Sequence, residues 1–281
     1  MTNTYRGVQL VVLVCAFVTG ANAQANEFQA QAIDAQPWEK FGLAVGGFAF
    51  SSDTEFRVNS STGIGTIVDV EETLGLDSQL GTYRIGLVYR PGNSRRHQIE
   101  LQYFDSSRDG NKTLDEDIQI GDNFFPAGTN VASEFDLRFI NLDYAYAFLQ
   151  DDRVRLAGSV GLHVTEARLR IDSAELRISE DESFTAPLPT IGIRAEMMLT
   201  PKWRFKTGLD LLYLEYKGFA GVLTDAYIGV EYLAFSNFGF GLGFNGVRYR
   251  IEGNGSTADL DLNGELQLDL DGVLFYGKYF F

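Results

Sequence analysis

The chain ends with the stretch LDGVLFYGKYFF (270–281), and the pattern of this stretch decides the fold. In an extended strand, alternate side chains lie on the same face. One face here carries Val273, Phe275, Tyr279 and Phe281, and the other carries Lys278. Chain ends are usually polar and tolerant of change, so this alternating, aromatic end predicts an ordered final strand.

The same alternation runs upstream through most of the sequence, with apolar side chains on one face and polar side chains or glycine on the other. It predicts ten strands, at 40–50, 82–90, 97–104, 139–148, 154–164, 190–199, 203–213, 225–235, 238–245 and 273–281. Their connections alternate in length. Short polar turns such as PGNSRR (91–96) and QDDR (150–153) alternate with long segments at roughly 51–81, 106–132, 171–187 and 251–264.

Alternation of this kind fits both a soluble β-sandwich, which buries its apolar face, and a membrane barrel, which turns that face to lipid. The predicted strands match the length of a tilted membrane crossing, about nine to eleven residues. Aromatic residues also gather near the strand ends, as at a water–lipid boundary. These aromatic residues are Tyr89, Phe148, Trp203, Phe235, Phe238 and Phe281.

We therefore predict an all-β fold, a transmembrane antiparallel up-and-down barrel of about ten strands within residues 38–281. Eight or twelve strands remain alternatives, because 51–81 and 106–132 could be loops or supply a further hairpin. Within the first of these segments, residues 65–79 are apolar enough to fold over the barrel or into its mouth.

Residues 1–23 have the features of a secretory signal peptide. Arg6 precedes an apolar run from Val8 to Val18, and Ala21-Asn22-Ala23 forms a cleavage site. The apolar run is too short to span a membrane. We expect export, cleavage before Gln24, and a periplasmic tether at 24–37. Cys15, the only cysteine, falls in the signal, so no disulfide is expected.

Together with the signal peptide and the alternating strands, the terminal YGKYFF (276–281) resembles the Gram-negative outer-membrane β-barrel proteins. The resemblance implies the cell outer membrane, contact with its lipid and lipopolysaccharide, periplasmic chain ends and long acidic extracellular loops. Proteins of this superfamily commonly end in an aromatic strand that the barrel-assembly machinery recognises. Phe275, Tyr279 and Phe281 match that signal, but the resemblance implies no particular activity.

In such a barrel the polar face of each strand points into the lumen. The predicted lumen charge network is Arg84, Glu100, Asp143, Arg155, Arg194, Glu196, Arg204, Lys206, Asp210 and Glu231, and Arg90, His163 and Lys278 share the inward face. Both signs are mixed, and a barrel of about ten strands is narrow enough for long side chains to meet. We predict a salt-bridged lumen, with a narrow solute path as the alternative. Rings of one sign, which favour a pore, are not apparent.

Catalysis can be tested against the two histidines, His97 and His163. His163 and Thr165 share a face, and outer-membrane lipid hydrolases carry a His and a Ser at this spacing. Threonine is the poorer nucleophile, the pair points at the lumen, and no third member can be identified. An omptin-like protease would cluster Asp and His at the outer rim. Neither histidine falls there, since His97 lies beside a short turn, which is expected at the periplasmic end. We predict no catalytic residue.

The remaining signals are largely negative. The sequence contains no phosphate-binding loop, metal–thiolate cluster or nucleotide fingerprint, so no cofactor or metal is predicted. Its net charge of −15 argues against nucleic acid as a partner. We expect a monomeric structural or surface-interacting barrel with a filled lumen. A narrow channel is the second possibility, and a lipid-modifying or proteolytic enzyme is the third.

Overall fold

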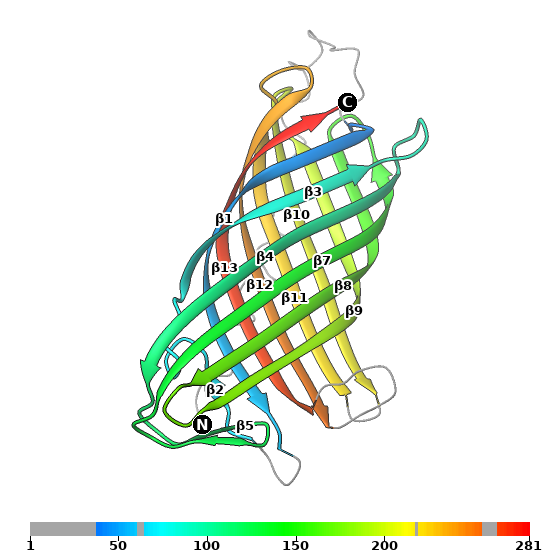
Figure 1. Ribbon diagram of the computed structural model, residues 1–281. Coiled ribbons are helices and arrows are strands. Elements are labelled where there is room, and N and C mark those ends of the chain that lie inside the picture. Colours follow the sequence, from blue (N-terminus) through cyan, green and yellow to red (C-terminus); the bar gives the residue numbers. More distant parts are fainter. Residues whose placement is uncertain (1–37, 61–64, 217–218, 255–262) are drawn as a thin grey trace, which may run out of the picture. The chain divides into compact units, whose positions relative to one another are not determined.

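The computed structural model describes residues 38–60, 65–216, 219–254 and 263–281 (Figure 1). The predicted signal peptide at 1–23 and the tether at 24–37 lie outside the described residues. The described residues belong to one compact unit, Pro37–Phe281. Among them there is no helix long and apolar enough to cross a membrane.

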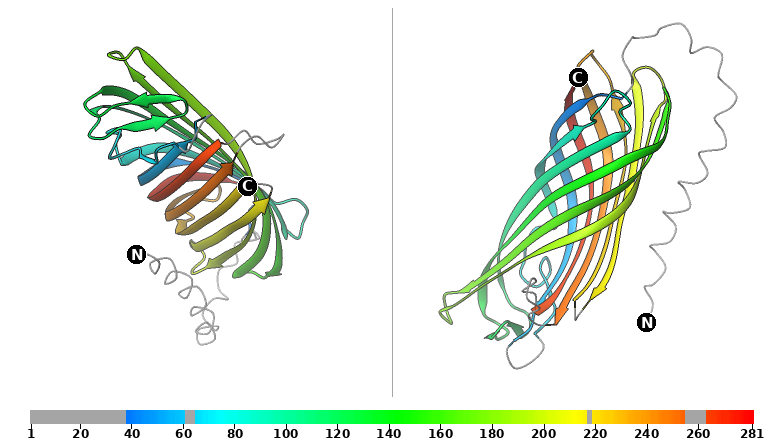
Figure 2. Two further views of the ribbon diagram at one scale, coloured as in Figure 1. Left: turned by 90° about the horizontal axis from the view of Figure 1, so that it is seen from below. Right: turned by 90° about the vertical axis from the view of Figure 1, so that its right-hand side faces the viewer.

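Ten long antiparallel strands form a closed barrel, since β13 pairs with β1 as well as with β12 (Figures 1 and 2). The strands are β1 (Phe41–Val58), β3 (Gln79–Tyr89), β4 (His97–Thr113), β7 (Asn130–Gln150), β8 (Val154–Ser173), β9 (Ile178–Met198), β10 (Trp203–Tyr216), β11 (Phe219–Tyr232), β12 (Phe238–Asn254) and β13 (Asn263–Phe280). Each pairs with its neighbours in chain order. The predicted up-and-down barrel of about ten strands is confirmed.

The short turns lie at one end of the barrel and are hydrogen-bonded to one another. The Arg90 amide donates to the Lys40 carbonyl, and the Leu233 amide donates to the Lys202 carbonyl. The last residue, Phe281, exchanges backbone hydrogen bonds with Phe41, which closes the barrel at the same end. Short turns are periplasmic in barrels of this type, so we call this the periplasmic end and the opposite one the outer end.

Near the periplasmic end, the outward side chains are apolar. On β7 they are Ile140, Leu142, Tyr144, Tyr146 and Phe148, all exposed. Exposed residues of the same kind on other strands are Val160, Leu162, Ile191, Ile193, Leu242, Phe275 and Tyr279. Such a band has no counterpart on the surface of a soluble barrel and fits the hydrocarbon core of a membrane. We call this part of the barrel the belt half.

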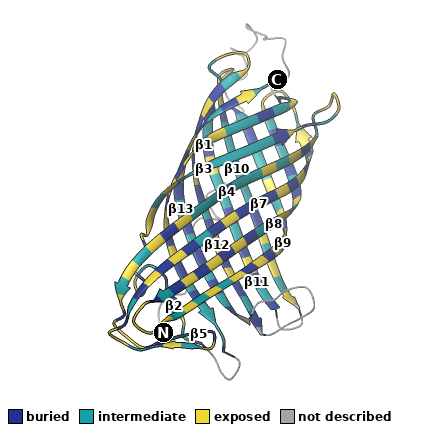
Figure 3. Cartoon of the chain, viewed as in Figure 1, coloured by how far each residue is buried: buried dark blue, intermediate teal, exposed yellow. Residues whose placement is uncertain are grey.

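The strands continue beyond the belt, and there the polarity of their two faces is exchanged. On β7, Glu134, Asp136 and Arg138 point outward, while Phe135 and Phe139 point inward and are buried. On β13, Asp269 and Asp271 lie outside, while the leucines between and beside them are buried. We call this part, which includes 131–139 on β7 and 264–271 on β13, the outer half. Figure 3 shows the alternation of buried and exposed residues continuing along these strands.

The outer half makes the strands longer than predicted. β4 runs to Thr113, β9 begins at Ile178 and β13 begins at Asn263, so parts of the predicted loops 106–132, 171–187 and 251–264 are strand. The predicted strands are those in which apolar side chains alternate with polar side chains or glycine in a single phase. Beyond the belt the outward face is charged and the phase of the alternation is exchanged, so the acidic residues there predict a loop.

Apolar segments between the strands close the outer mouth. The segment 65–78 includes β2 (Val68–Asp69), which pairs with β1, and buries Val68, Val70, Leu74 and Leu76. A hairpin of β5 (Ile118–Ile120) and β6 (Asn123–Phe125) buries Ile118, Ile120 and Phe125. These residues belong to one hydrophobic core with Phe135, Leu169 and Leu268 from the barrel wall.

Candidate functional site

The polar side chains inside the belt half are the candidate functional site. Strand register sets charged residues side by side on the inner wall. The directly opposed pairs are Glu100 with Asp143, Arg155 with Glu196, Lys206 with Glu196, Arg204 with Glu231, and Asp210 with Asp225. The three pairs of opposite sign lie nearer the periplasmic end, where the register itself places the partners of ion pairs side by side, and the two carboxylate pairs lie further along the lumen.

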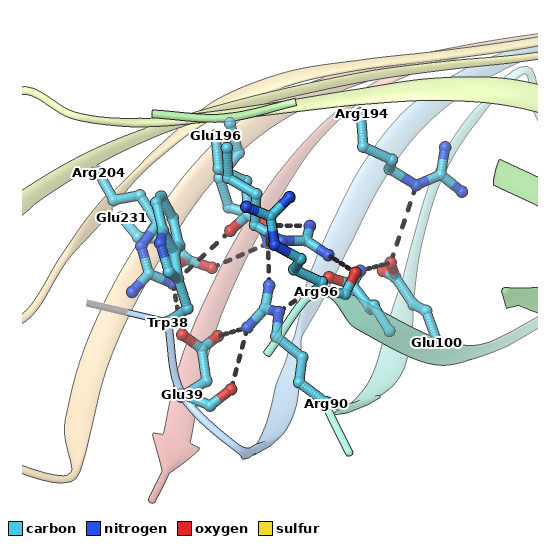
Figure 4. Close-up of polar contacts among 12 residues, drawn as sticks. Trp38, Glu39, Arg90, Arg96, Glu100, Arg194, Glu196, Arg204 and Glu231 are labelled. Atoms are coloured by element: carbon cyan, nitrogen blue, oxygen red, sulfur yellow. Dashed lines mark hydrogen bonds and ion pairs between the residues drawn. The ribbon is translucent and has the colours of Figure 1, made fainter. Parts of the chain in front are cut away.

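The first group of lumen charges lies near the periplasmic end, and we call it the inner cluster: Glu39, Arg90, Arg155, Glu196, Arg204, Lys206, Glu231 and Lys278. Figure 4 labels Glu39, Arg90, Glu196, Arg204 and Glu231 of this cluster. Glu196 accepts from Arg90 at 2.8 Å and from Arg155 at 3.1 Å. Arg90, Arg155 and Arg204 are among the largest fully buried side chains of the described chain. Burying a guanidinium is costly unless it is paired and hydrogen-bonded, as these are.

Glu39 completes the inner cluster. It is buried among the lumen charges, although it precedes β1 and belongs to no strand. Its carboxylate lies 3.0 Å from Arg90, 2.8 Å from Arg204 and 2.5 Å from Lys278. The neighbouring Trp38 packs over the Arg204 guanidinium at 5.5 Å and donates from Nε1 to the Asp151 carbonyl at 2.8 Å. The chain entering β1 therefore closes the periplasmic end with a charge and a ring.

The second group, the mid-barrel cluster, consists of Arg84, Glu100, Asp143, Arg194, Asp210 and Asp225, with His163 beside it. Arg194 is its centre: its guanidinium lies 2.8 Å from Asp210, 3.4 Å from Asp143 and 3.9 Å from Glu100. Arg84 makes no ion pair among the described residues. It donates to Gln102 and, at 2.6 Å, to Asn245, which in turn donates to Asp225 at 2.6 Å.

A cavity of about 130 Å³ lies between the two clusters. Its lining includes Arg84, Glu100, Arg194, Lys206 and Glu231. A space of this size holds several water molecules, and its walls offer them many polar partners. The centre of the belt half is therefore a polar cavity with room for water, between two layers of ion pairs.

The ten residues of the predicted charge network line the lumen, and nine of them make ion pairs there. Arg84 is the exception, since its partners are amides. Sequence reasoning missed Glu39, which precedes the first alternating strand and so has no pattern to place it. It also missed the Arg108–Glu71 pair, which is buried in the apolar outer half. There the Arg108 guanidinium lies 5.0 Å from the Phe135 ring centroid.

The two histidines lie in different surroundings. His97 is exposed beside the periplasmic turn 91–96, and its Nδ1 is 2.7 Å from the Tyr144 hydroxyl. His163 is buried in the lumen, as is Thr165 two residues along β8. Neither histidine lies at the outer rim. The predicted assembly-signal residues Phe275, Tyr279 and Phe281 point outward in the lipid-facing band and are all exposed.

No protein-family model and no curated protein sequence matches this chain. Solved structures do match. The outer membrane protease OmpT from Escherichia coli aligns over 86% of this chain and 96% of its own, with a TM-score of 0.57 and 11% sequence identity. The attachment invasion locus protein Ail of Yersinia pestis covers 85% of this chain and 99% of its own, with a TM-score of 0.35 and 9% identity. The P. putida toluene transporter TodX covers 86% and 90%, with a TM-score of 0.33 and 9% identity.

At these identities the likeness concerns the fold and not an activity. The closed antiparallel topology, the lipid-facing apolar band and the short turns at one end agree with it. The chain thus shares the closed antiparallel β-barrel fold of the outer membrane protease OmpT.

Proposed function

We propose that this protein is a non-conducting outer-membrane barrel that acts through the surface it presents outside the cell. The observation that carries the proposal is that side chains close the lumen at two levels. Ion pairs fill the belt half, and a hydrophobic core fills the outer half.

The inner cluster forms the first barrier. Its arginines are fully buried and held by carboxylates from β9, β11 and the segment before β1. Moving any one of them aside would leave a buried charge unpaired, which costs about 3–5 kcal/mol. An ion path through this layer therefore requires the collective rearrangement of several ion pairs.

The outer core forms the second barrier, in series with the first. Phe135, Leu169 and Leu268 project inward and are at most 1% exposed. The segment 65–78 and the β5–β6 hairpin add their own apolar side chains to the same core. An apolar constriction excludes ions, because they cannot keep their hydration shell there.

The outer half also supports a role at the cell surface. A barrel that only anchored itself would need strands of about nine to eleven residues. Here β7 and β9 each have 21 residues, and the part beyond the belt has its own core and its own closing hairpin. The exposed loop residues at the mouth are strongly acidic and include Glu72, Asp77, Asp115, Glu116, Asp117 and Asp122. This rigid acidic surface is the part of the protein that an external partner would meet.

The positions of the histidines favour a non-enzymatic role. An acid–base or nucleophilic site needs a titratable group within reach of its substrate. His163 faces the closed lumen and His97 faces the membrane boundary at the periplasmic end. Neither reaches the outer rim, where an extracellular substrate would arrive.

A narrow channel is the second candidate, and the cavity of about 130 Å³ between the clusters is the observation that favours it. Conductance of the refolded protein in a planar bilayer distinguishes the two candidates. We expect a folded barrel that is electrically silent. Discrete, reproducible openings of the wild-type protein would replace this proposal with the channel.

Two designed variants sharpen this experiment by removing each barrier separately. Arg155→Ala with Glu196→Ala opens the first barrier, and Phe135→Ala with Phe139→Ala opens the second. Because the barriers lie in series, we expect each double variant to stay silent and their combination to conduct. A silent combination that is still folded would show that the lumen is closed elsewhere and would contradict the two-barrier account.

A further inference from the structure

One group of buried side chains beside Arg194 contains polar atoms that lack a hydrogen-bond partner among the described residues, although two of its members, Asp143 and Asp210, also pair with that arginine. Asp143 on β7, His163 on β8 and Asp210 on β10 point into the lumen at the boundary between the mid-barrel cluster and the apolar core. They are 2%, 1% and 7% exposed. One potential ligand atom from each lies within 4.8 Å of the other two.

His163 is the most informative member of this triad. Neither of its ring nitrogens has a hydrogen-bond partner among the described residues, and neither has either carboxylate oxygen of Asp143. The His163 Nε2 atom lies 3.7 Å from Asp143 Oδ1, which is too far for a hydrogen bond. Buried polar atoms nearly always have a partner, so both ring nitrogens of His163 and Asp143 Oδ1 are open to a bound species.

Two glycines on the inner wall of the barrel leave space for the carboxylates. Gly161 is the residue on β8 that faces Asp143, and Gly192 is the residue on β9 that faces Asp210. A Cβ atom at Gly161 would collide with Asp143 Oδ1, and one at Gly192 would collide with Asp210 Oδ1. The two glycines leave the carboxylates free to approach the histidine.

The charge of the surroundings favours a cation. The mid-barrel cluster has four carboxylates, on Glu100, Asp143, Asp210 and Asp225, against the guanidinium groups of Arg84 and Arg194. With His163 neutral, this layer carries an excess of two negative charges. The inner cluster has the opposite excess, with three carboxylates against five cationic side chains.

Arg194 leaves the relevant oxygen of Asp143 available. Its guanidinium approaches Asp143 through Oδ2, at 3.4 Å, whereas Oδ1 is the atom that faces His163. A carboxylate can hold an arginine with one oxygen and a metal ion with the other, which is the usual way in which outer partners orient a ligand. Thr190, whose Oγ1 is buried without a hydrogen-bond partner among the described residues, faces Gly161 on the neighbouring strand.

We propose that Asp143, His163 and Asp210 bind one divalent transition-metal ion of the zinc class inside the barrel. One imidazole and two carboxylates are a ligand set for Zn²⁺ or Co²⁺, and the imidazole disfavours Mg²⁺ and Ca²⁺. Ligand atoms around a tetrahedral ion at about 2.0–2.2 Å are roughly 3.3–3.6 Å apart, so the side chains need to close by about 1 Å. Asp210 also lines the lumen cavity, from which a water molecule can complete the coordination.

The site would tie β7, β8 and β10 together across the lumen, at the level where the polar filling ends. It lies far from the acidic outer loops, so it is independent of the proposed surface role and of whether the barrel conducts.

The test uses the refolded full barrel in detergent, freed of metal with a chelator and then dialysed against Co²⁺ or Zn²⁺. We expect about one ion per barrel and, with Co²⁺, the visible absorption bands of a four- or five-coordinate site. A folded wild-type protein that binds no ion, or binds Co²⁺ only with the spectrum of the hydrated ion, would overturn the proposal.

Two matched pairs of variants assign the ligands. His163→Ala is compared with His97→Ala, which removes the other histidine, and Asp143→Asn is compared with Asp136→Asn, an outward carboxylate of the same strand. We expect the affinity to fall more than about tenfold in the lumen variants and to stay unchanged in the two controls. Loss of binding in a control variant alone, or undiminished binding in both lumen variants, would contradict the assignment. If His163→Ala fails to fold, the isosteric Asp143→Asn variant still decides.

Discussion

The belt half and the outer half of this barrel are built from the same strands, but the apolar face of each strand points outward in the first and inward in the second. On β7, the outward side chains are Ile140, Leu142 and Tyr144 in the belt half and Glu134, Asp136 and Arg138 in the outer half. The inward side chains change in the opposite sense, from Asn141 and Asp143 to Phe135 and Phe139. The pleat continues without interruption, and only the chemistry of its two faces is exchanged.

The solvent outside the wall explains the exchange. In the belt half the outside is lipid, so burial of apolar surface inside gains nothing, and ion pairs can fill the lumen. In the outer half the outside is water, and the hydrophobic effect drives apolar side chains inward as in a soluble protein. The same strand thus contributes to a membrane barrel at one end and to a water-soluble core at the other.

The largest expected effect is in the belt lumen. Glu231→Ala removes the carboxylate that lies 3.3 Å from each of Arg204, Lys206 and Lys278 and accepts from the Tyr276 hydroxyl at 2.8 Å. Leaving buried cations without their partner should destabilise the barrel by about 3–5 kcal/mol in reversible unfolding. Glu166→Ala, an exposed acidic residue of the outer half, is the control and should change the stability little. Similar losses in both variants would contradict the distinction.

A second pair of substitutions compares two leucines of β8. Leu169 is 1% exposed inside the outer half, whereas Leu162 is 41% exposed in the lipid-facing band. Leu169→Ala creates a cavity in a packed core and should cost about 2–5 kcal/mol. Leu162→Ala creates no cavity and should cost less than about 1 kcal/mol. Unfolding in urea measures both, and equal costs would show that the outer half has no core of its own.

A third pair places a charge on the outward face of β7. Leu142→Arg inserts a cation near the middle of the lipid-facing band and should cost about 2–4 kcal/mol. Asp136→Arg makes the change on the same strand and face beyond the belt, where the side chain meets water, and should stay within about 0.5 kcal/mol. The effects of both substitutions are measured as the refolding yield in lipid vesicles and as the free energy of unfolding. A strong effect of the Asp136 variant would place lipid beyond the boundary proposed here.

The smallest effect concerns the exposed ion pairs of the outer half. Arg168 donates to Asp181 and holds the pKa of that carboxyl below its usual range. A pKa lowered in the folded state contributes stability above the unfolded pKa of about 3.9, and this contribution is lost as the pH falls through the folded value. Carbon-detected NMR titration should show the lowered pKa, and Arg168→Gln should raise it. An unchanged Asp181 pKa in that variant would remove the pair from the account.

The belt half was predictable from sequence, whereas the outer half was predicted only in part. The apolar segment 65–79 was expected to fold over the barrel or into its mouth, and residues 65–78 do lie there, but the continuation of the strands beyond the belt was not expected. An apolar face at Val273, Phe275 and Tyr279 opposite Lys278 specifies a strand with lipid outside. In the same strand, Leu268 and Leu270 alternate with Asp269 and Asp271, which is the pattern of a strand with water outside. The sequence marks the boundary between the two halves at Gly272. Before it the apolar residues Leu268 and Leu270 occupy even positions, and after it Val273 and Phe275 occupy odd positions.

The site was predictable in composition and not in connectivity. Polar faces identified Arg194, Asp210 and Glu231 as lumen residues, but which charges meet depends on strand register across the barrel. The triad of Asp143, His163 and Asp210 could not be found from spacing, because its members come from three strands and 67 positions separate the first from the last. Glu39 lies outside any alternating segment, and only the closed barrel brings it to Lys278.

The central claim, that the membrane boundary crosses the strands where their polarity is exchanged, can be tested on β7 alone. Single cysteines would replace the outward residues from Glu134 to Phe148 in turn, in a chain without Cys15, and carry a fluorophore exposed to water-soluble or lipid-soluble quenchers. We predict lipid exposure from Ile140 to Phe148 and water exposure at Glu134 and Asp136, with the change between Arg138 and Ile140. Lipid exposure continuing to Glu134, or water exposure at Leu142 and Tyr144, would contradict the division of the barrel into two halves.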